Sequence, residues 1–141
     1  MNEAKRRLVL AWCAKAENDL LTARLLIEQE QRLLDAGVYH CQQSGEKILK
    51  AWLTLDDIVF PKTHDLETLV HLCRNRYPEF STYAEHARLL TPLATEFRYP
   101  GDFNEPSLER ARQALHLATE LHGHCREYIE KRLAGPDRAS D

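Results

Sequence analysis

The chain has 141 residues, of which 43% are hydrophobic and 29% charged, and its formal net charge is −3. These values are typical of one globular domain with a core of its own. The small negative charge excludes a general attraction to nucleic acid or to anionic membranes, so phosphate binding would need a local basic cluster. No apolar run approaches the roughly 20 residues of a membrane-spanning helix, and no signal-peptide core follows the basic N-terminus. We therefore expect a cytoplasmic protein.

Helical periodicity runs through the first third of the chain, and no segment has the pattern of a strand. A helix is predicted over residues 3–31 because apolar residues recur there every three or four positions. These residues are Leu8, Trp12, Ala16, Leu20, Ala23 and Ile27. A second helix is predicted over residues 37–55, and it is apolar around most of its circumference. Such a helix belongs at the centre of a bundle.

Three more helical segments are predicted after residue 62. The first has its N-cap at Thr63 and stops before Pro78, and the next contains Phe80 and is kinked or restarted at Pro92. A loop at 98–106 precedes a last helix over residues 107–133. Short connections favour antiparallel neighbours. We expect an all-α fold, an up-and-down antiparallel bundle of four to five helices over residues 1–134, with a disordered tail at 135–141.

Polar residues lie inside these apolar faces. Gln42 and Glu46 interrupt the wide apolar face of the second helix, and Asp19 lies beside the apolar stripe of the first. An unpaired buried polar group costs about 1–3 kcal/mol, so these side chains need partners. We predict that Asp19, Gln42 and Glu46 form a structural polar core.

The four cysteines are far apart, without a C-x-x-C pair: Cys13, Cys41, Cys73 and Cys125. Each adjoins apolar residues, as expected for buried thiols. Histidines near the C-terminus lack a second cluster that would complete a tetrahedral zinc site. We expect no metal and no cofactor.

The chain resembles the HEPN domain, the higher-eukaryote and prokaryote nucleotide-binding family. The first helix has the family's aromatic–alanine–aspartate pattern, the second has its Q-Q-x-x-E-K-x-x-K-A run, and two short motifs follow. The matching residues are Trp12, Ala16, Asp19, Leu20, Ala23, Gln42, Gln43, Glu46, Lys47, Lys50, Ala51, K-T-H-D-L at 62–66 and R-Y-P at 98–100. The resemblance extends over residues 12–133.

This resemblance implies a helical bundle that forms a homodimer and binds a nucleotide or nucleic acid. It also implies a partner, because bacterial members work beside a small nucleotidyltransferase in pairs that resemble toxin–antitoxin systems. Active members are metal-independent RNases with an R-x4–6-H motif. Counting from Arg98, the histidine positions hold Phe103, Asn104 and Glu105. We therefore expect no catalytic residues.

Arg110 and His116 also have the spacing of that motif, but they lie inside the last helix. Six helical residues correspond to 240° net, so the two side chains do not share a face. We interpret this match as accidental.

Five residues are candidates for phosphate binding, each with a structural alternative. Lys47 and Lys50 lie on the polar strip of the second helix, where two ammonium groups can bind one anion. The structural alternative is that this strip is only a solvated face. His64 stands at a helix start, where backbone N–H groups favour anions, or it has a capping role. Arg98 has a planar guanidinium whose N–H donors match the geometry of a phosphate. The structural alternatives are an ion pair with Glu46 or Asp19, or a cap at a helix C-terminus. Tyr99 stacks on a base or anchors its loop.

Three functions remain open at this point. The first is a nucleotide- or RNA-phosphate-binding protein on a dimeric bundle. The second is a non-catalytic interaction scaffold that docks to a partner such as a nucleotidyltransferase. The third is an RNase toxin with an altered R-x4–6-H motif.

Overall fold

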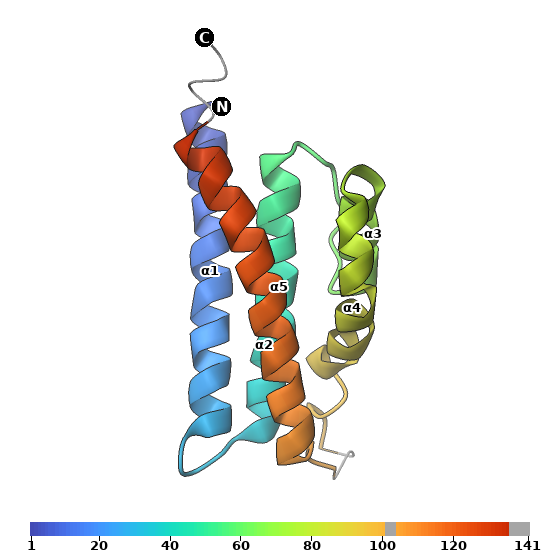
Figure 1. The fold of residues 1–141 in the computed structure, drawn as a ribbon. Coiled ribbons are helices and arrows are strands. Elements are labelled where there is room, and N and C mark those ends of the chain that lie inside the picture. The colour runs from blue at the N-terminus through green and yellow to red at the C-terminus, as the bar shows by residue number, and fades with distance from the viewer. Residues whose placement is uncertain (101–103, 136–141) are drawn as a thin grey trace.

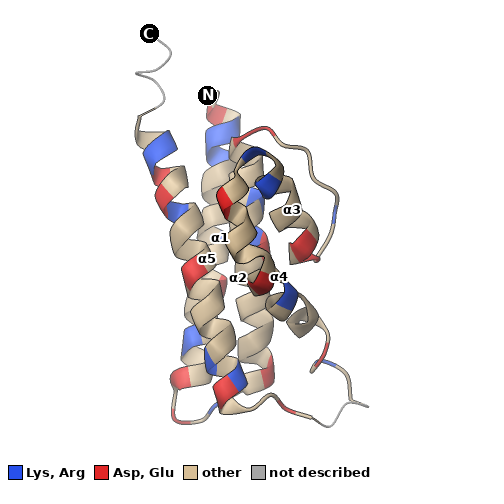
Figure 2. Ribbon diagram, turned by 45° about the vertical axis from the view of Figure 1, so that its right-hand side comes forward, with Lys and Arg blue, Asp and Glu red and all other residues tan. Residues whose placement is uncertain are grey.

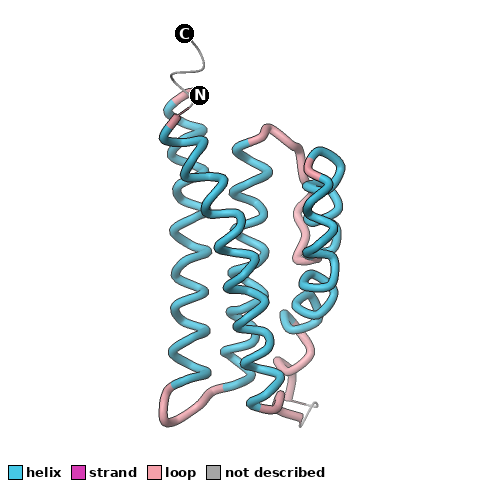
Figure 3. Tube along the Cα trace, in the orientation of Figure 1, coloured by secondary structure: helices cyan, strands magenta, loops and turns pink. Residues whose placement is uncertain are grey.

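The structure is a computed structural model, and it describes residues 1–100 and 104–135 (Figures 1 and 3). It contains five α-helices: α1 (Glu3–Glu28), α2 (Leu34–Leu55), α3 (Leu66–Arg76), α4 (Ala84–Leu90) and α5 (Leu108–Ala134). The 3-10 helices η1 (Pro78–Tyr83) and η2 (Thr91–Ala94) flank α4. The described residues include no strand, so the predicted all-α bundle is confirmed. Positions 136–141 of the predicted tail lie outside the described residues.

The long helices α1, α2 and α5 form the main body of the bundle. In Figure 1, α1 lies at one edge, α5 crosses in front of α2, and α3 and α4 lie beyond α2 on the other side. The central helix α2 packs against α1, α3 and α5 and also contacts η2. None of the described helices is long and apolar enough to cross a membrane.

Helix α2 is buried around most of its surface, as its sequence predicts. Its apolar residues fill the core, and Ser44 donates a hydrogen bond to the Ala16 carbonyl of α1 at 3.0 Å. The helix ends in a Schellman motif, with N–H groups of Asp57 and Ile58 on the carbonyls of Thr54 and Leu53. Asp57 has a φ of 56°, which places an aspartate where glycine is usual. This stop sends the chain into the loop that carries the K-T-H-D-L segment.

Several helix boundaries differ from the prediction because local hydrogen bonds decide them. The N-cap of α3 is Asp65, whose carboxylate accepts from Glu67 N at 3.0 Å, whereas Thr63, two residues earlier, accepts from Asp65 N. The predicted fourth helix is short and lies between two 3-10 helices that begin near Pro78 and Pro92. Leu8, predicted on the apolar stripe of α1, is exposed, and its neighbour Val9 is buried instead.

All four cysteines are free and buried. Desolvation raises the pKa of the Cys41 thiol to about 12 and that of Cys73 to about 12. Burial likewise raises the pKa of Cys125 well above its usual value. These thiols therefore stay protonated at neutral pH and act as small core side chains.

Two helical glycines offer a matched test of this packing. A Cβ at Gly37 would lie 2.5 Å from Cγ1 of the buried Ile27, whereas a Cβ at Gly123 would meet nothing within 4 Å. Gly37→Ala should lower the free energy of unfolding by about 1–2 kcal/mol because α1 and α2 must move apart. Gly123→Ala should raise it by about 0.5–1 kcal/mol through helix propensity. Urea unfolding followed by circular dichroism measures both, and equal changes for the two variants would contradict the packing.

Candidate functional site

The buried carboxylate of Glu46 is the centre of a polar cluster on α2. Its side chain is 5% exposed, and it accepts a hydrogen bond from Lys50 Nζ at 3.0 Å and from His64 Nδ1 at 2.8 Å. The amide of Gln42 approaches the same carboxylate at 3.4 Å. One buried acid is thus shared by two basic groups and an amide. A buried charge is tolerated when it is paired and hydrogen-bonded in this way.

Lys50 lies beneath two aromatic rings. Its ammonium is 5.7 Å from the Trp12 ring centroid and 5.9 Å from that of Phe60. The residue is buried, and its charge is balanced by Glu46 four positions earlier. The sequence proposed Lys50 as a phosphate contact, but the structure places its ammonium in the interior. We therefore leave Lys50 out of the ligand-binding set.

Gln42 ties the loop before α3 to the surface of α2. Its Nε2 donates to the backbone carbonyl of His64 at 2.8 Å, and its Oε1 accepts from Gln43 Nε2 at 2.7 Å. Gln42 is fully buried, while Gln43 is half-buried. The two glutamines therefore hold the K-T-H-D-L backbone in place beside the helix.

A second buried acid, Asp19 of α1, binds two basic side chains of α2. It accepts from Lys47 Nζ at 2.6 Å and from His40 Nδ1 at 2.8 Å. The Lys47 side chain is partly exposed, and its ammonium is paired with Asp19. The predicted polar core residues Asp19 and Glu46 thus lie in two separate clusters, each with its own lysine and histidine.

His64 is the exposed member of the Glu46 cluster, with a side chain 78% exposed. Because an ionised carboxylate only accepts hydrogen bonds, Nδ1 carries the proton that Glu46 accepts. The other ring nitrogen, Nε2, makes no hydrogen bond with the described residues and faces solvent. The imidazole therefore has a fixed orientation and one open nitrogen, an arrangement known from histidines held by a carboxylate.

Arg98 lies against the same helix, one to two turns earlier. Its guanidinium stacks on the Tyr39 ring, with Cζ 4.2 Å from the ring centroid. Within the described part of the chain the guanidinium makes no ion pair and no hydrogen bond. The structure therefore does not pair Arg98 with Glu46 or with Asp19, the two acids considered from the sequence. Stacking uses the face of the guanidinium and leaves its N–H donors at the edge.

The two exposed groups, Arg98 and His64, contact residues on one face of α2. Tyr39 and Glu46 are seven residues apart, which is about two helical turns or roughly 10 Å along the helix axis. Arg98 contacts the first of them and His64 the second. Gln43 lies between Tyr39 and Glu46 on the same face. The ends of the intervening segment are also joined, because Leu66 N donates to Thr91 Oγ1 at 3.1 Å. The structure thus places two residues that are 34 positions apart in the chain against one face of α2.

Some residues near this face were not among the candidate site residues proposed from the sequence. Tyr39 is the platform for Arg98, and its position two turns before Glu46 was the available signal. Lys62 is exposed and lies two residues before His64. Tyr99 is 65% exposed, so it does not anchor the loop into the core. Of the positions expected for a motif histidine, Asn104 and Glu105 are exposed, and Phe103 lies outside the described residues.

Arg110 and His116, whose spacing also matches the motif, have different partners in the structure. Arg110 forms an ion pair with Glu96 at 2.9 Å, whereas His116 lies 3.3 Å from Glu120 on the same helix. No metal-binding group of three or more histidine, cysteine or acidic side chains occurs among the described residues. Charges of both signs are interspersed along the helices (Figure 2). The exposed basic groups beside the α2 face are His64 and Arg98.

Comparisons with known proteins agree with the fold. The HEPN domain family matches residues 9–128. The crystal structure of an archaeal HEPN homologue aligns with a TM-score of 0.66 and 23% sequence identity, covering 86% of this chain and 97% of that one. No curated protein matches the sequence. At this identity the structural likeness supports the fold alone, and the family match over most of the chain supports membership. The chain belongs to the HEPN domain family.

Proposed function

We propose that this HEPN protein binds the phosphates of a nucleotide or of RNA on the open face of α2, through Arg98 and His64. The observation that carries the proposal is that each of these groups is held on that face by a separate partner, Tyr39 or Glu46, with its donor side in solvent. Both are therefore oriented before a ligand arrives. Preorganised groups lose less conformational entropy on binding.

The chemistry of the face suits anionic oxygens. The guanidinium edge of Arg98 matches a phosphate in two-point geometry, and His64 Nε2 binds a second oxygen when the ring is protonated. Their partners Tyr39 and Glu46 are about 10 Å apart along the helix axis, a spacing that suits two phosphates of one ligand better than a single ion. Lys47 lies on the same helix with a partly exposed side chain whose ammonium pairs with Asp19, and the exposed Tyr99 ring offers a stacking surface for a base.

We include in the same proposal two further properties that the family resemblance implies for this chain. These are a homodimer, and a pairing with a small nucleotidyltransferase in a toxin–antitoxin-like system. The scaffold alternative predicts docking to such a partner without ligand binding. A binding measurement on the α2 face separates the two.

Substitution of the two exposed groups tests the anion site. Arg98→Ala and His64→Ala should each weaken ATP or short RNA binding by about tenfold, because each removes about one charge-assisted hydrogen bond. Isothermal titration calorimetry at low ionic strength measures the affinity. Lys131→Ala is the control, because Lys131 is an exposed cation at the far end of α5. Equal losses in all three variants, or no binding by the wild type, would reject the site and favour the scaffold.

A second candidate function is phosphodiester transfer on RNA, favoured by the geometry of His64. The ring donates through Nδ1 to Glu46 and leaves Nε2 open, as a general base requires. In such a step Nε2 takes the proton of a ribose 2′-hydroxyl, the 2′-oxygen bonds to phosphorus, and the P–O5′ bond breaks. Water protonates the departing 5′-oxygen, and the products carry a 2′,3′-cyclic phosphate and a 5′-hydroxyl. Arg98 would stabilise the charge on the phosphoryl oxygens.

Cleavage of a labelled RNA oligonucleotide without metal tests this second function. His64→Ala should lower the rate by a factor of roughly 10²–10⁴, the usual contribution of a general base. His71→Ala is the matched control, because His71 is an exposed histidine of α3 outside the α2 face. RNA that stays intact with the wild-type protein would leave phosphate binding as the function and exclude catalysis by His64.

A further inference from the structure

Two buried nitrogen atoms near the C-terminal end of α2 have no hydrogen-bond partner among the described residues. They are the indole Nε1 of Trp52, a residue that is 1% exposed, and the imidazole Nε2 of His124 on α5. A buried polar group without a partner costs free energy, so a native structure that keeps one requires an explanation. Both nitrogens can therefore bind a molecule other than the chain itself.

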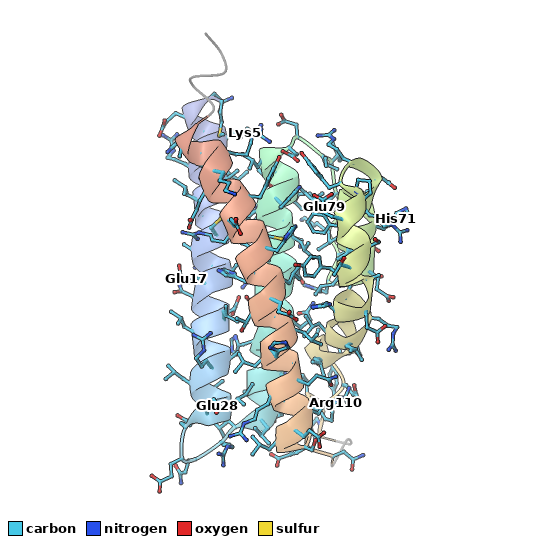
Figure 4. The ribbon with its side chains drawn as sticks, in the orientation of Figure 1. Lys5, Glu17, Glu28, His71, Glu79 and Arg110 are labelled. Carbon is cyan, nitrogen blue, oxygen red and sulfur yellow. The ribbon has the colours of Figure 1, made fainter. Side chains whose placement is uncertain are left out.

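Both residues line one cavity between η1 and α5. The cavity has a volume of about 240 Å³, and its other lining residues are Glu79, Glu127, Tyr128 and Lys131. Figure 4 shows Glu79 between α5 and α3. An apolar cavity of about 150 Å³ is enough for benzene, whereas drug-sized ligands occupy about 300–1,000 Å³. This cavity therefore has room for a single substituted ring.

Aromatic rings support the inner wall of the cavity. The Trp52 ring is stacked on Tyr128 with centroids 3.8 Å apart and on His124 with centroids 5.7 Å apart. Phe80 meets Trp52 and His124 edge-on, at 4.7 and 5.4 Å. The Tyr128 hydroxyl donates to Asp56 Oδ1 at 3.0 Å, which fixes the orientation of that ring. Packing and hydrogen bonding thus hold the wall in place before a ligand arrives.

The rim of the cavity carries one unbalanced negative charge. Glu79 is exposed, and within the described part of the chain it forms neither an ion pair nor a hydrogen bond. The other two charged rim residues neutralise each other, because Lys131 Nζ lies 3.1 Å from Glu127 Oε1. An ionised carboxylate only accepts hydrogen bonds, and it repels other anions. A ligand of this cavity should therefore be neutral or cationic and should carry an N–H donor.

We propose that this cavity binds a small planar nitrogen heterocycle that is not an anion and that carries an amide or amino group. The indole N–H of Trp52 can only donate, so it binds an acceptor such as a ring nitrogen or an amide oxygen. His124 Nε2 donates or accepts according to its tautomer. The Glu79 carboxylate accepts from the amide or amino N–H, and the ring of the ligand packs on the aromatic wall.

This proposal does not depend on the proposed function. None of the residues assigned to the phosphate site lines the cavity. The two sites also select opposite charges, because the α2 face offers cationic donors and the cavity offers a carboxylate at its rim.

An NMR titration with nicotinamide, a nitrogen heterocycle that carries an amide, tests the site. The chain has two tryptophans, so its proton–nitrogen correlation spectrum contains two indole N–H signals, which the Trp12→Phe variant assigns. The Trp52 signal should shift and saturate with a dissociation constant on the order of 1 mM. The Trp12 signal should not move, because Trp12 lies on α1 and does not line the cavity. No shift, or equal shifts of both signals, would overturn the proposal.

Nicotinate is the matched control ligand, since it has the same ring with a carboxylate in place of the amide. It should bind about tenfold more weakly than nicotinamide, because its charge is repelled by Glu79 and it has no N–H to donate. Equal affinities of the two ligands would contradict the assigned ligand class.

Substitutions at the cavity test the assigned contacts. Glu79→Ala should raise the dissociation constant of nicotinamide about tenfold, because it removes a hydrogen bond to a charged group. Glu30→Ala should leave it unchanged, since Glu30 is an exposed carboxylate in the loop after α1. His124→Phe keeps an aromatic ring in the wall but removes Nε2, and it should weaken binding about fivefold. An unchanged affinity in Glu79→Ala or in His124→Phe would overturn the proposal.

The Arg98→Ala variant separates this site from the phosphate site. It should bind nicotinamide as the wild type does, whatever its affinity for ATP. Loss of nicotinamide binding in this variant would contradict an independent cavity site, whereas absence of ATP binding by the wild type would reject only the proposed function.

Discussion

The buried carboxylate of Glu46 is the interaction on which the site depends. It lies in the interior of the bundle with the Lys50 ammonium beside it, and removing Glu46 would leave that buried ammonium without its counter-charge. The same carboxylate also accepts a hydrogen bond from the exposed side chain of His64. A polar group required by the core thus also fixes the orientation of an exposed side chain. Stability and recognition therefore share one residue.

The sequence predicts the helices well because their periodicity is local. The wide apolar face of α2 and the polar residues within it follow from spacing along one helix. Boundaries were less accurate where a side chain competes for the backbone: Asp65 rather than Thr63 caps α3, and prolines break the fourth segment into 3-10 turns. At the start of α1, Val9 rather than Leu8 enters the core, whereas the members of the predicted stripe from Ala16 onward are buried as expected.

The candidate site was only partly predictable, because its contacts join distant segments. Spacing showed that Glu46 needed a partner, but not that a loop histidine and Lys50 would both supply it. It also could not reveal that Arg98 lies on an aromatic ring instead of an acid. The path of the loops across α2 decides both contacts. Sequence spacing within one helix contains no information on that path.

The hydrogen bond between Leu66 N and Thr91 Oγ1 has a consequence for how this flank of the bundle is held in place. It closes the excursion formed by α3, η1 and α4 into a loop whose two ends meet beside α2. The bond joins the residues at which the excursion begins and ends, so its entry and exit points beside α2 are held together directly and not only through the chain between them.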